Sequence, residues 1–207
     1  MNRSKDVVEI TRETYDQTAV DYSSMVNELV TNSWVGKFEQ NLLDDFLSFF
    51  KSVVPKILDI GCGNGKDTAY LMQKGANVIG VDYSSGMLEE ARKHVAKGVF
   101  IQMDMRSLQL SNEVFDGAWA NGCIYHVPKN SLATVLTEIL RVLNPSGVLS
   151  FNFKLGVGEK LEDAPRSFQK GPRFYAYYKK SEMKKCRVRS MPSATGDYRI
   201  RSILIYL

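Results

Sequence analysis

Apolar residues in the middle of the chain form short runs, each bounded by glycine, proline or a polar turn. The runs with the length of a buried strand are residues 56–60, 77–81, 99–103, 115–120 and 148–153. Between these runs, apolar positions recur with the three-to-four-residue spacing of a helix over residues 67–74, 84–96 and 129–143. Strands that alternate with helices in this way predict a parallel sheet with helices on both faces.

The two ends of the chain have different patterns. Residues 6–30 and 34–47 show helical spacing, which predicts two lid helices before the first strand, with Asn32 or Ser33 as the second N-cap. Residues 156–172 are rich in glycine, proline and charge and predict a loop or lid. A short helix is expected at 180–185 and strands at 187–191 and 200–207.

Together these elements predict one α/β domain of 207 residues. We expect a Rossmann-like doubly wound sheet, mostly parallel with an antiparallel C-terminal strand, and helices on both faces. Residues 1–54 would form the helical lid, 55–153 a ligand-binding core, and 154–207 an insertion and the last strands.

Composition is that of an ordinary soluble globular protein, with 44% apolar and 24% charged residues. Apolar runs do not approach the ~18 residues of a membrane span, and the polar N-terminus lacks a signal-peptide core. Three widely separated cysteines fit neither a disulfide framework nor a zinc site, so we expect a cytoplasmic protein without a structural metal.

Charge is distributed unevenly along the chain. Residues 1–153 carry 14 Lys/Arg and 18 Asp/Glu, whereas residues 154–207 carry 13 and 5. A basic C-terminal part can serve an anionic substrate or a nucleic acid, or can be a solvated lysine-rich face. We expect the solvated face, because no arginine-rich run is present.

A glycine-rich loop follows the first predicted strand, with Gly61, Gly63 and Gly65 at alternate positions. Glycine permits positive φ and lets a ligand approach the backbone closely. The spacing is not the G-x-G-x-x-G of dinucleotide sites, since Lys66 stands where the third glycine would be. The preceding acid, Asp59, disfavours a phosphate and favours a ligand with an ammonium or sulfonium group.

Acidic residues lie at or next to the ends of three successive predicted strands: Asp59, Asp82 and Asp104. Ligands of parallel sheets bind at the carboxyl ends of the strands, so these side chains are expected around one crevice. Asp82 lies 21 residues after Gly61, the usual distance for a carboxylate that binds ribose hydroxyls. The alternative is that each aspartate caps the following helix. S-adenosylmethionine combines a sulfonium, an ammonium, a ribose and an adenine.

Five segments resemble, in order, the motifs of class I S-adenosylmethionine-dependent methyltransferases of the small-molecule type. They are 58–65 (LDIGCGNG), 80–88 (GVDYSSGML), 102–105 (QMDM), 115–128 (FD through HVP) and 141–147 (RVLNPSG). Tyr15-Asp16 with Ala19 and Tyr22 also resembles the Y-D-x-x-A-x-x-Y segment that precedes the core in many members.

The resemblance implies residue roles and S-adenosyl-L-methionine as cofactor, with S-adenosyl-L-homocysteine as product. Asp59 and the backbone of Gly61 and Gly63 would hold the methionine end, and Asp82 the ribose. The remaining implied contacts are Asp104 with the adenine amino group, Met105, Tyr83 and Met87 beside the ring, and Asn121 near the methionine part. Tyr83 and Met87 could instead fill the seam between helix and sheet.

The acceptor side is less specific. His126 and Tyr22 are candidates for a catalytic role, although His126 could simply be hydrogen-bonded to the backbone. Residues expected around the acceptor are Tyr15, Tyr22, Trp34, His126, Arg173 and Tyr175, any of which could be core. The hypothesis is methyl transfer to an O or N atom of a small molecule by a monomer or homodimer. Alternatives are an RNA methyltransferase that uses the basic C-terminal part, and a non-catalytic S-adenosylmethionine-binding protein.

Overall fold

The computed structural model describes residues 5–32, 34–163, 171–183 and 203–206, apart from the side chains of 29–32, 34–35, 183 and 203–206. Its helices are α1 (Val7–Asn32), α2 (Trp34–Ser48), α3 (Lys66–Gln73), α4 (Ser85–His94), α5 (Leu132–Val142) and α6 (Lys180–Met183), with 3-10 turns η1 (Ile124–His126) and η2 (Lys129–Ser131). Its strands are β1 (Lys56–Ile60), β2 (Asn77–Asp82), β3 (Val99–Gln102), β4 (Phe115–Ala120), β5 (Leu143–Asn152), β6 (Lys154–Leu155), β7 (Glu159–Asp163), β8 (Pro172–Tyr178) and β9 (Ile203–Tyr206).

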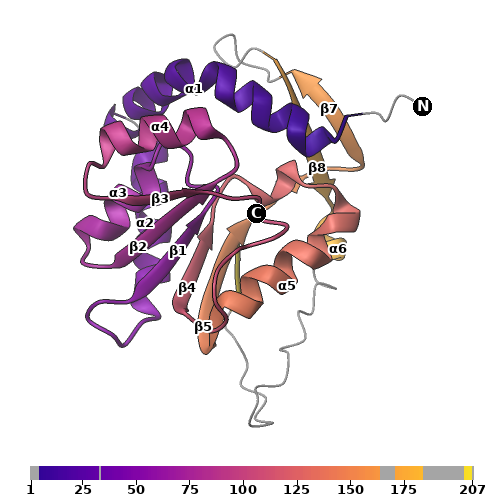
Figure 1. The fold of residues 1–207 in the computed structure, drawn as a ribbon. Coiled ribbons are helices and arrows are strands. Elements are labelled where there is room, and N and C mark those ends of the chain that lie inside the picture. Colours follow the sequence, from indigo (N-terminus) through magenta and orange to yellow (C-terminus); the bar gives the residue numbers. More distant parts are fainter. Residues whose placement is uncertain (1–4, 33, 164–170, 184–202, 207) are drawn as a thin grey trace.

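The main sheet has the strand order β3-β2-β1-β4-β5-β9 (Figure 1). Each neighbouring pair is parallel, and the order reverses between β1 and β4. A ligand site is expected at the carboxyl ends of the strands at this reversal. The predicted Rossmann-like α/β sheet is therefore confirmed.

Side chains alternate between the two faces of each strand, and this alternation separates two cores. Ile57 and Trp119 pack with Leu43 and Phe46 of α2 on one face. Leu58 and other residues of the opposite face pack with α5. Helices thus cover both faces, as the alternating sequence pattern predicts.

One glycine in β4 permits a close approach between helix α2 and the sheet. A Cβ atom on Gly117 would lie 2.5 Å from Cζ of Phe50 and 2.8 Å from Cζ of Phe46. These distances are shorter than real Cβ contacts, so a side chain at this position would push the two aromatic rings away.

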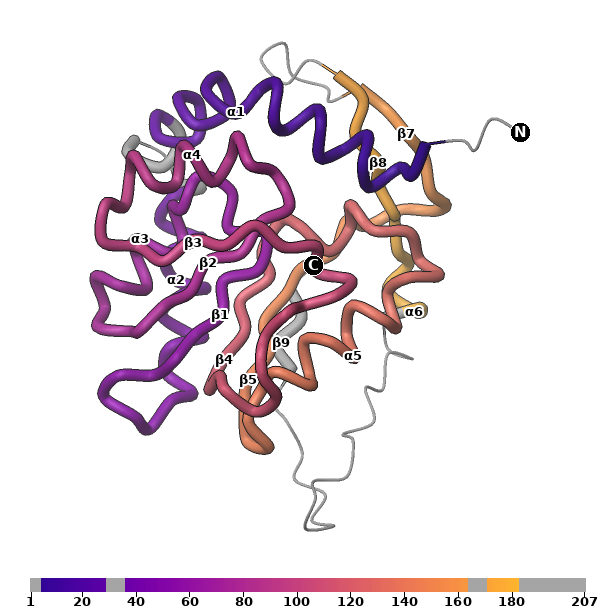
Figure 2. The backbone as a smooth tube through the Cα atoms, in the orientation of Figure 1, coloured from indigo at the N-terminus to yellow at the C-terminus, as the bar shows by residue number. Residues whose placement is uncertain are grey.

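The two N-terminal helices occupy different places. Helix α1 crosses above the carboxyl ends of the strands and contacts α4 and β8 (Figure 2). The buried side of α2 instead packs on the sheet, although Glu39 of α2 reaches the pocket described below. Of the two helices predicted as a lid, α1 thus lies over the carboxyl ends of the strands and α2 does not, and the lid role of α1 stays a prediction.

The C-terminal part differs from the expected strand pattern. The predicted antiparallel last strand is wrong, because β9 pairs in parallel with β5, with Leu149 opposite Ile203. An apolar run such as residues 203–207 predicts burial but carries no information about strand direction. The predicted strand at 187–191 lies outside the described residues.

The segment expected to be a loop, residues 156–172, contains β7. β7 pairs antiparallel with β8, and β6 pairs with β8 on its other side in a small second sheet. The sequence pattern did not predict β7 because its residues are mostly charged and exposed.

Throughout the described residues, every helix is too short or too polar to cross a membrane.

Candidate active site

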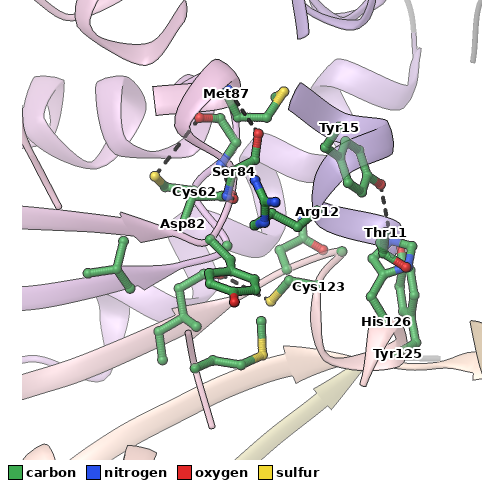
Figure 3. A pocket seen from close by; sticks show the side chains of 18 of the residues that line it. Thr11, Arg12, Tyr15, Cys62, Asp82, Ser84, Met87, Cys123, Tyr125 and His126 are labelled. Atoms are coloured by element: carbon green, nitrogen blue, oxygen red, sulfur yellow. Dashed lines mark hydrogen bonds between the residues drawn. The ribbon is translucent and has the colours of Figure 1, made fainter. Parts of the chain in front are cut away.

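A pocket of about 560 Å³ lies at the carboxyl ends of β1, β2 and β4, below α1. This volume is in the range of small-molecule and cofactor sites, roughly 300–1,000 Å³. Asp82, Ser84 and Met87 lie at one side of it, and Tyr15, Tyr125 and His126 at the other (Figure 3). The pocket therefore has two chemically different ends.

The glycine loop forms the floor of the first end. Gly61 and Gly63 have φ values of 65° and 54°, a left-handed conformation that side chains other than glycine rarely adopt. The Gly61 N–H donates to the Val81 carbonyl at 2.8 Å, and a Cβ on Gly61 would lie 2.3 Å from that of Cys123. Both the backbone conformation and the packing therefore require glycine at residue 61.

Asp82 connects the glycine loop to the start of α4. Its Oδ2 accepts from the Gly63 N–H at 2.9 Å, and its Oδ1 accepts from the Ser84 N–H at 2.8 Å. Burial raises the pKa of this carboxyl, while the backbone donors lower it. A carboxylate has about four lone-pair sites, so Asp82 can still accept a hydrogen bond from a ligand.

Tyr83 and Met87 both line this end of the pocket. Met87 is buried, and its methyl group lies 3.3 Å from where a Cβ of Gly63 would be. The Tyr83 hydroxyl donates to Glu9 at 2.9 Å, and the Arg12 guanidinium lies 5.6 Å from the Tyr83 ring centroid. Tyr83 is thus held from α1.

Asp104 and Met105 line the same end after β3. The Asp104 carboxylate accepts from the backbone N–H and the Nε of Arg106, both at 2.8 Å. Arg106 in turn donates to Asp6 at 2.7 Å. An adenine amino group would therefore have to share Asp104 with Arg106.

Asp59 lies behind the loop instead of on the pocket wall. Alternation along β1 places it on the same face as Ile57, toward α3. There it accepts from the Thr68 hydroxyl at 2.6 Å and is almost completely buried. Burial, with a smaller contribution from Asp67, raises its pKa to about 8.

A polar network that the sequence did not predict connects the ends of β4 and β5. Asp67 accepts from Trp119 Nε1 at 2.8 Å, and Asn121 Nδ2 lies 3.4 Å from the same oxygen. Asn152 Nδ2 donates to Oδ1 of Asn121 at 2.5 Å, and Asn152 Oδ1 accepts from the Gly122 N–H at 2.8 Å. The sequence offered one signal for this network, the place of these residues at the ends of strands, because Asn121 directly follows β4 and Asn152 ends β5.

His126 is hydrogen-bonded at both ring nitrogens. Its Nδ1 lies 2.7 Å from the Phe174 carbonyl oxygen, which can only accept, so Nδ1 carries the proton. Its Nε2 lies 3.0 Å from the Tyr15 hydroxyl and accepts from it. Burial lowers the pKa of His126 to about 4, so the imidazole is neutral at pH 7.

The other residues expected around an acceptor are only partly brought together. Tyr15, Tyr22 and Tyr175 line the pocket with His126. Arg173 is buried behind Tyr15, with its guanidinium 4.6 Å from the Tyr15 ring centroid. The side chain of Trp34 lies outside the described part of the chain. Lining residues that the sequence did not predict include Asn64, Lys66, Tyr125 and Lys154.

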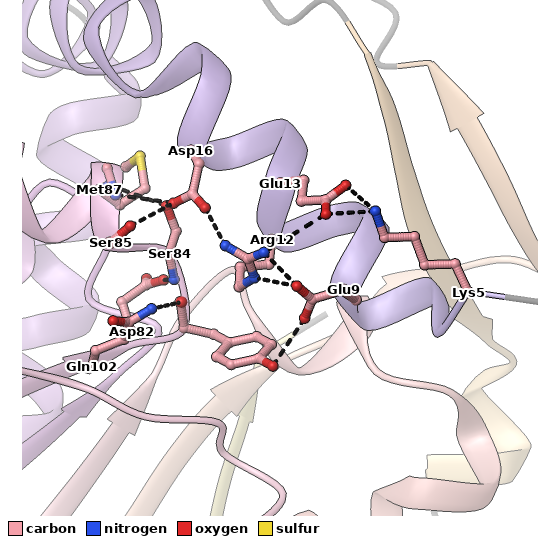
Figure 4. A network of polar contacts seen from close by, with 12 residues as sticks. Lys5, Glu9, Arg12, Glu13, Asp16, Asp82, Ser84, Ser85, Met87 and Gln102 are labelled. Carbon is pink, nitrogen blue, oxygen red and sulfur yellow. Dashed lines mark hydrogen bonds and ion pairs between the residues drawn. The ribbon is translucent and has the colours of Figure 1, made fainter.

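Asp16 fixes α1 over the pocket (Figure 4). Its Oδ1 accepts from the Ser84 hydroxyl at 2.7 Å and from the Gly86 N–H at 3.0 Å, and its other oxygen pairs with Arg12. The close approach requires Gly86, because a Cβ there would lie 2.8 Å from the Asp16 carbonyl oxygen. The Y-D-x-x-A-x-x-Y segment thus attaches α1 to the first turn of α4.

Within the residues that the structure describes, His, Cys, Asp and Glu form no group of three or more that could hold a metal ion.

The central part of the chain is similar to known proteins. Residues 57–147 match the family model described as a methyltransferase domain. A malonyl-[acyl-carrier protein] O-methyltransferase of Enterobacter lignolyticus is 35% identical over 96 residues, which is 46% of this chain and 38% of that protein. A trans-aconitate 2-methyltransferase of Azoarcus is 38% identical over 96 residues, 45% of this chain and 37% of that protein. The chain thus matches less than half the length of these relatives.

Among solved structures, the Burkholderia thailandensis 1,6-didemethyltoxoflavin-N1-methyltransferase superposes with a TM-score of 0.59 at 22% identity. The alignment covers 88% of this chain and 78% of that protein, which was solved with bound 1,6-didemethyltoxoflavin and S-adenosylhomocysteine. At this identity the similarity shows a shared fold.

Proposed function

We propose that this protein is an S-adenosylmethionine-dependent methyltransferase that acts on an O or N atom of a small molecule, because residues 57–147 match the family model described as a methyltransferase domain. The observation that carries the proposal is the contact between Asp82 and the Gly63 N–H. It joins a carboxylate suited to ribose hydroxyls to a glycine loop suited to the methionine end, within one pocket.

The residues present fit such a cofactor. Asn64 lines the pocket and is buried, and its amide nitrogen has no hydrogen-bond partner among the described residues. A buried amide donor is costly unless a ligand accepts from it. Asp82 would hold the ribose, Met87 and Met105 would contact the adenine, and the backbone of Gly61 and Gly63 would face the methionine part.

The cofactor, when bound, would supply a methyl group activated by a sulfonium. Transfer is an in-line displacement, so alignment of the acceptor atom in a closed pocket can provide most of the rate. Helix α1 would provide this closure, since Tyr15 and Tyr22 face the pocket from above and Asp16 anchors the helix.

Tyr15 and His126 act here as a positioning pair. With Nε2 occupied by the Tyr15 hydroxyl and a pKa of about 4, His126 is a poor general base at neutral pH. Its contribution would be to hold the Tyr15 ring at the acceptor end. An acceptor that needs little proton abstraction, such as a carboxylate or a neutral amine, suits this site best.

The test is transfer of a labelled methyl group from S-adenosylmethionine into a cell metabolite extract, followed by separation of small molecules from RNA. We expect label in a small molecule. Label in RNA, with a steep loss of activity between low and physiological salt, would support the nucleic-acid alternative instead. Cofactor binding without any transfer would support a non-catalytic binding protein.

A further inference from the structure

The acceptor end of the pocket contains a lysine that neither the sequence motifs nor the family match includes. Lys154 follows β5 and lines the pocket beside Tyr125 and Tyr175. Its ammonium lies 3.6 Å from the Tyr175 ring centroid and 5.7 Å from that of Tyr125. Cation–π contacts of this kind hold the ammonium in place without neutralising its charge.

Lys154 differs from the other cations of the pocket wall. Arg12 is paired with Glu9 and Asp16, and Lys66 with Glu39 and Asp67. Among the described residues, Lys154 has neither an ion pair nor a hydrogen bond from its ammonium. Glu162 acts on Lys154 through its charge, but it forms no ion pair with it, and burial lowers the pKa of this half-buried ammonium. An anion that enters the pocket could contact this ammonium directly.

The surroundings restrict the charge and shape of this anion. The pocket wall also contains four acidic side chains, from Glu39, Asp67, Asp82 and Asp104. A doubly charged phosphate, which proteins usually bind through several donors or arginine forks, would be repelled here. A singly charged carboxylate needs only one ammonium. The aromatic side chains of Tyr15, Tyr22, Tyr125, His126 and Tyr175 leave an apolar space for its carbon skeleton.

We propose that the methyl acceptor is a small organic carboxylic acid whose carboxylate pairs with Lys154. This inference rests on the proposed function, since it specifies the acceptor of the same site. Lys154 is then a specificity-determining residue, and Tyr175 and Tyr125 hold its ammonium in the pocket.

The test compares three variants in the labelled-methyl assay. Lys154→Gln removes the charge, Lys154→Arg retains it, and Lys160→Gln is the matched control. Lys160 also lies over a tyrosine, 5.2 Å from the Tyr177 ring centroid, but it is exposed, pairs with Glu162 and is outside the pocket wall.

The metabolite extract is first divided on an anion exchanger into retained and unretained fractions. We expect the methyl acceptor in the retained fraction. Lys154→Gln should raise the KM for the acceptor in that fraction at least about tenfold, because the acceptor loses a hydrogen bond to a charged group. Lys154→Arg should restore most of the activity, Lys160→Gln should match the wild type, and S-adenosylhomocysteine affinity should be unchanged in all three.

Methyl transfer to an acceptor in the unretained fraction, or wild-type KM in Lys154→Gln, would overturn the inference and leave the proposed function standing. Absence of transfer in every fraction would instead contradict the proposed function. Equal loss of acceptor and cofactor binding in Lys154→Gln would show a general defect of the pocket and also overturn the inference.

Discussion

Replacing Asp82 with asparagine removes the charge that the account assigns to ribose binding and keeps the size of the side chain. The carboxylate already accepts backbone N–H groups at 2.9 and 2.8 Å, and a carboxylate has about four lone-pair sites, so it can also accept from a ribose hydroxyl. Loss of charge-assisted hydrogen bonds costs about 1–3 kcal/mol in binding. We therefore expect S-adenosylhomocysteine to bind roughly 5- to 150-fold more weakly.

The assay is calorimetric titration, and Asp116→Asn is the control. Asp116 also accepts two N–H groups, from the Lys56 backbone at 2.8 Å and from Asn144 at 2.9 Å, but it lies at the start of β4 away from the pocket. Both variants should lose folding stability, whereas only Asp82→Asn should lose cofactor affinity. Unchanged affinity in Asp82→Asn, or an equal loss in Asp116→Asn, would refute the ribose assignment.

Three further predictions concern the glycine loop, the lid and a buried carboxyl. In urea unfolding, Gly61→Ala should destabilise the fold by roughly 3 kcal/mol or more, because alanine would be strained in the left-handed conformation and would overlap Cys123. Gly158 has a φ of 83° but open space around it, so Gly158→Ala should cost only about 1–2 kcal/mol. Equal losses of stability in the two variants would contradict the packing argument. Asp16→Asn should lower the stability of the fold by about 1–3 kcal/mol and weaken cofactor binding, because α1 loses its anchor to α4. Asp21 is exposed on the same helix, so Asp21→Asn should change stability by less than about 0.5 kcal/mol. Full cofactor affinity in Asp16→Asn would argue against a lid role of α1. The pKa of Asp59 is raised to about 8, so the folded state binds this proton more tightly than the unfolded state does. The contribution of Asp59 to folding stability is therefore complete below about pH 4 and is lost as the pH rises to 8. Urea unfolding from pH 5 to 9 should therefore show a steeper fall in the wild type than in Asp59→Asn, and parallel curves would contradict the buried environment.

Features fixed by neighbouring residues could be predicted from the sequence. The strands of the core and the glycine loop follow from short apolar runs and from glycines that adopt positive φ. Ser84 is a residue type that favours the N-cap position, and its hydroxyl accepts from the Met87 N–H at 3.1 Å. Asp82 reaches the loop because it ends the strand next to β1, and parallel pairing brings their carboxyl ends together.

Features that depend on distant parts of the chain could not be predicted in this way. Placing Asp59 in the crevice ignored the alternation along β1, which turns its side chain toward Thr68 of α3. The direction of β9 depends on its pairing with β5, which the apolar pattern does not encode. The charged and exposed residues of β7 give no apolar signal for its pairing with β8. The Tyr15–His126 contact joins residues 111 positions apart and exists only because α1 folds back over the sheet.

Calorimetric titration of the wild-type protein with S-adenosylmethionine, S-adenosylhomocysteine and NAD tests the central claim most directly. The contact between Asp82 and Gly63, and the absence of the third glycine of a dinucleotide loop, predict that the two sulfur-containing ligands bind and that NAD does not. Binding of NAD alone would contradict the account.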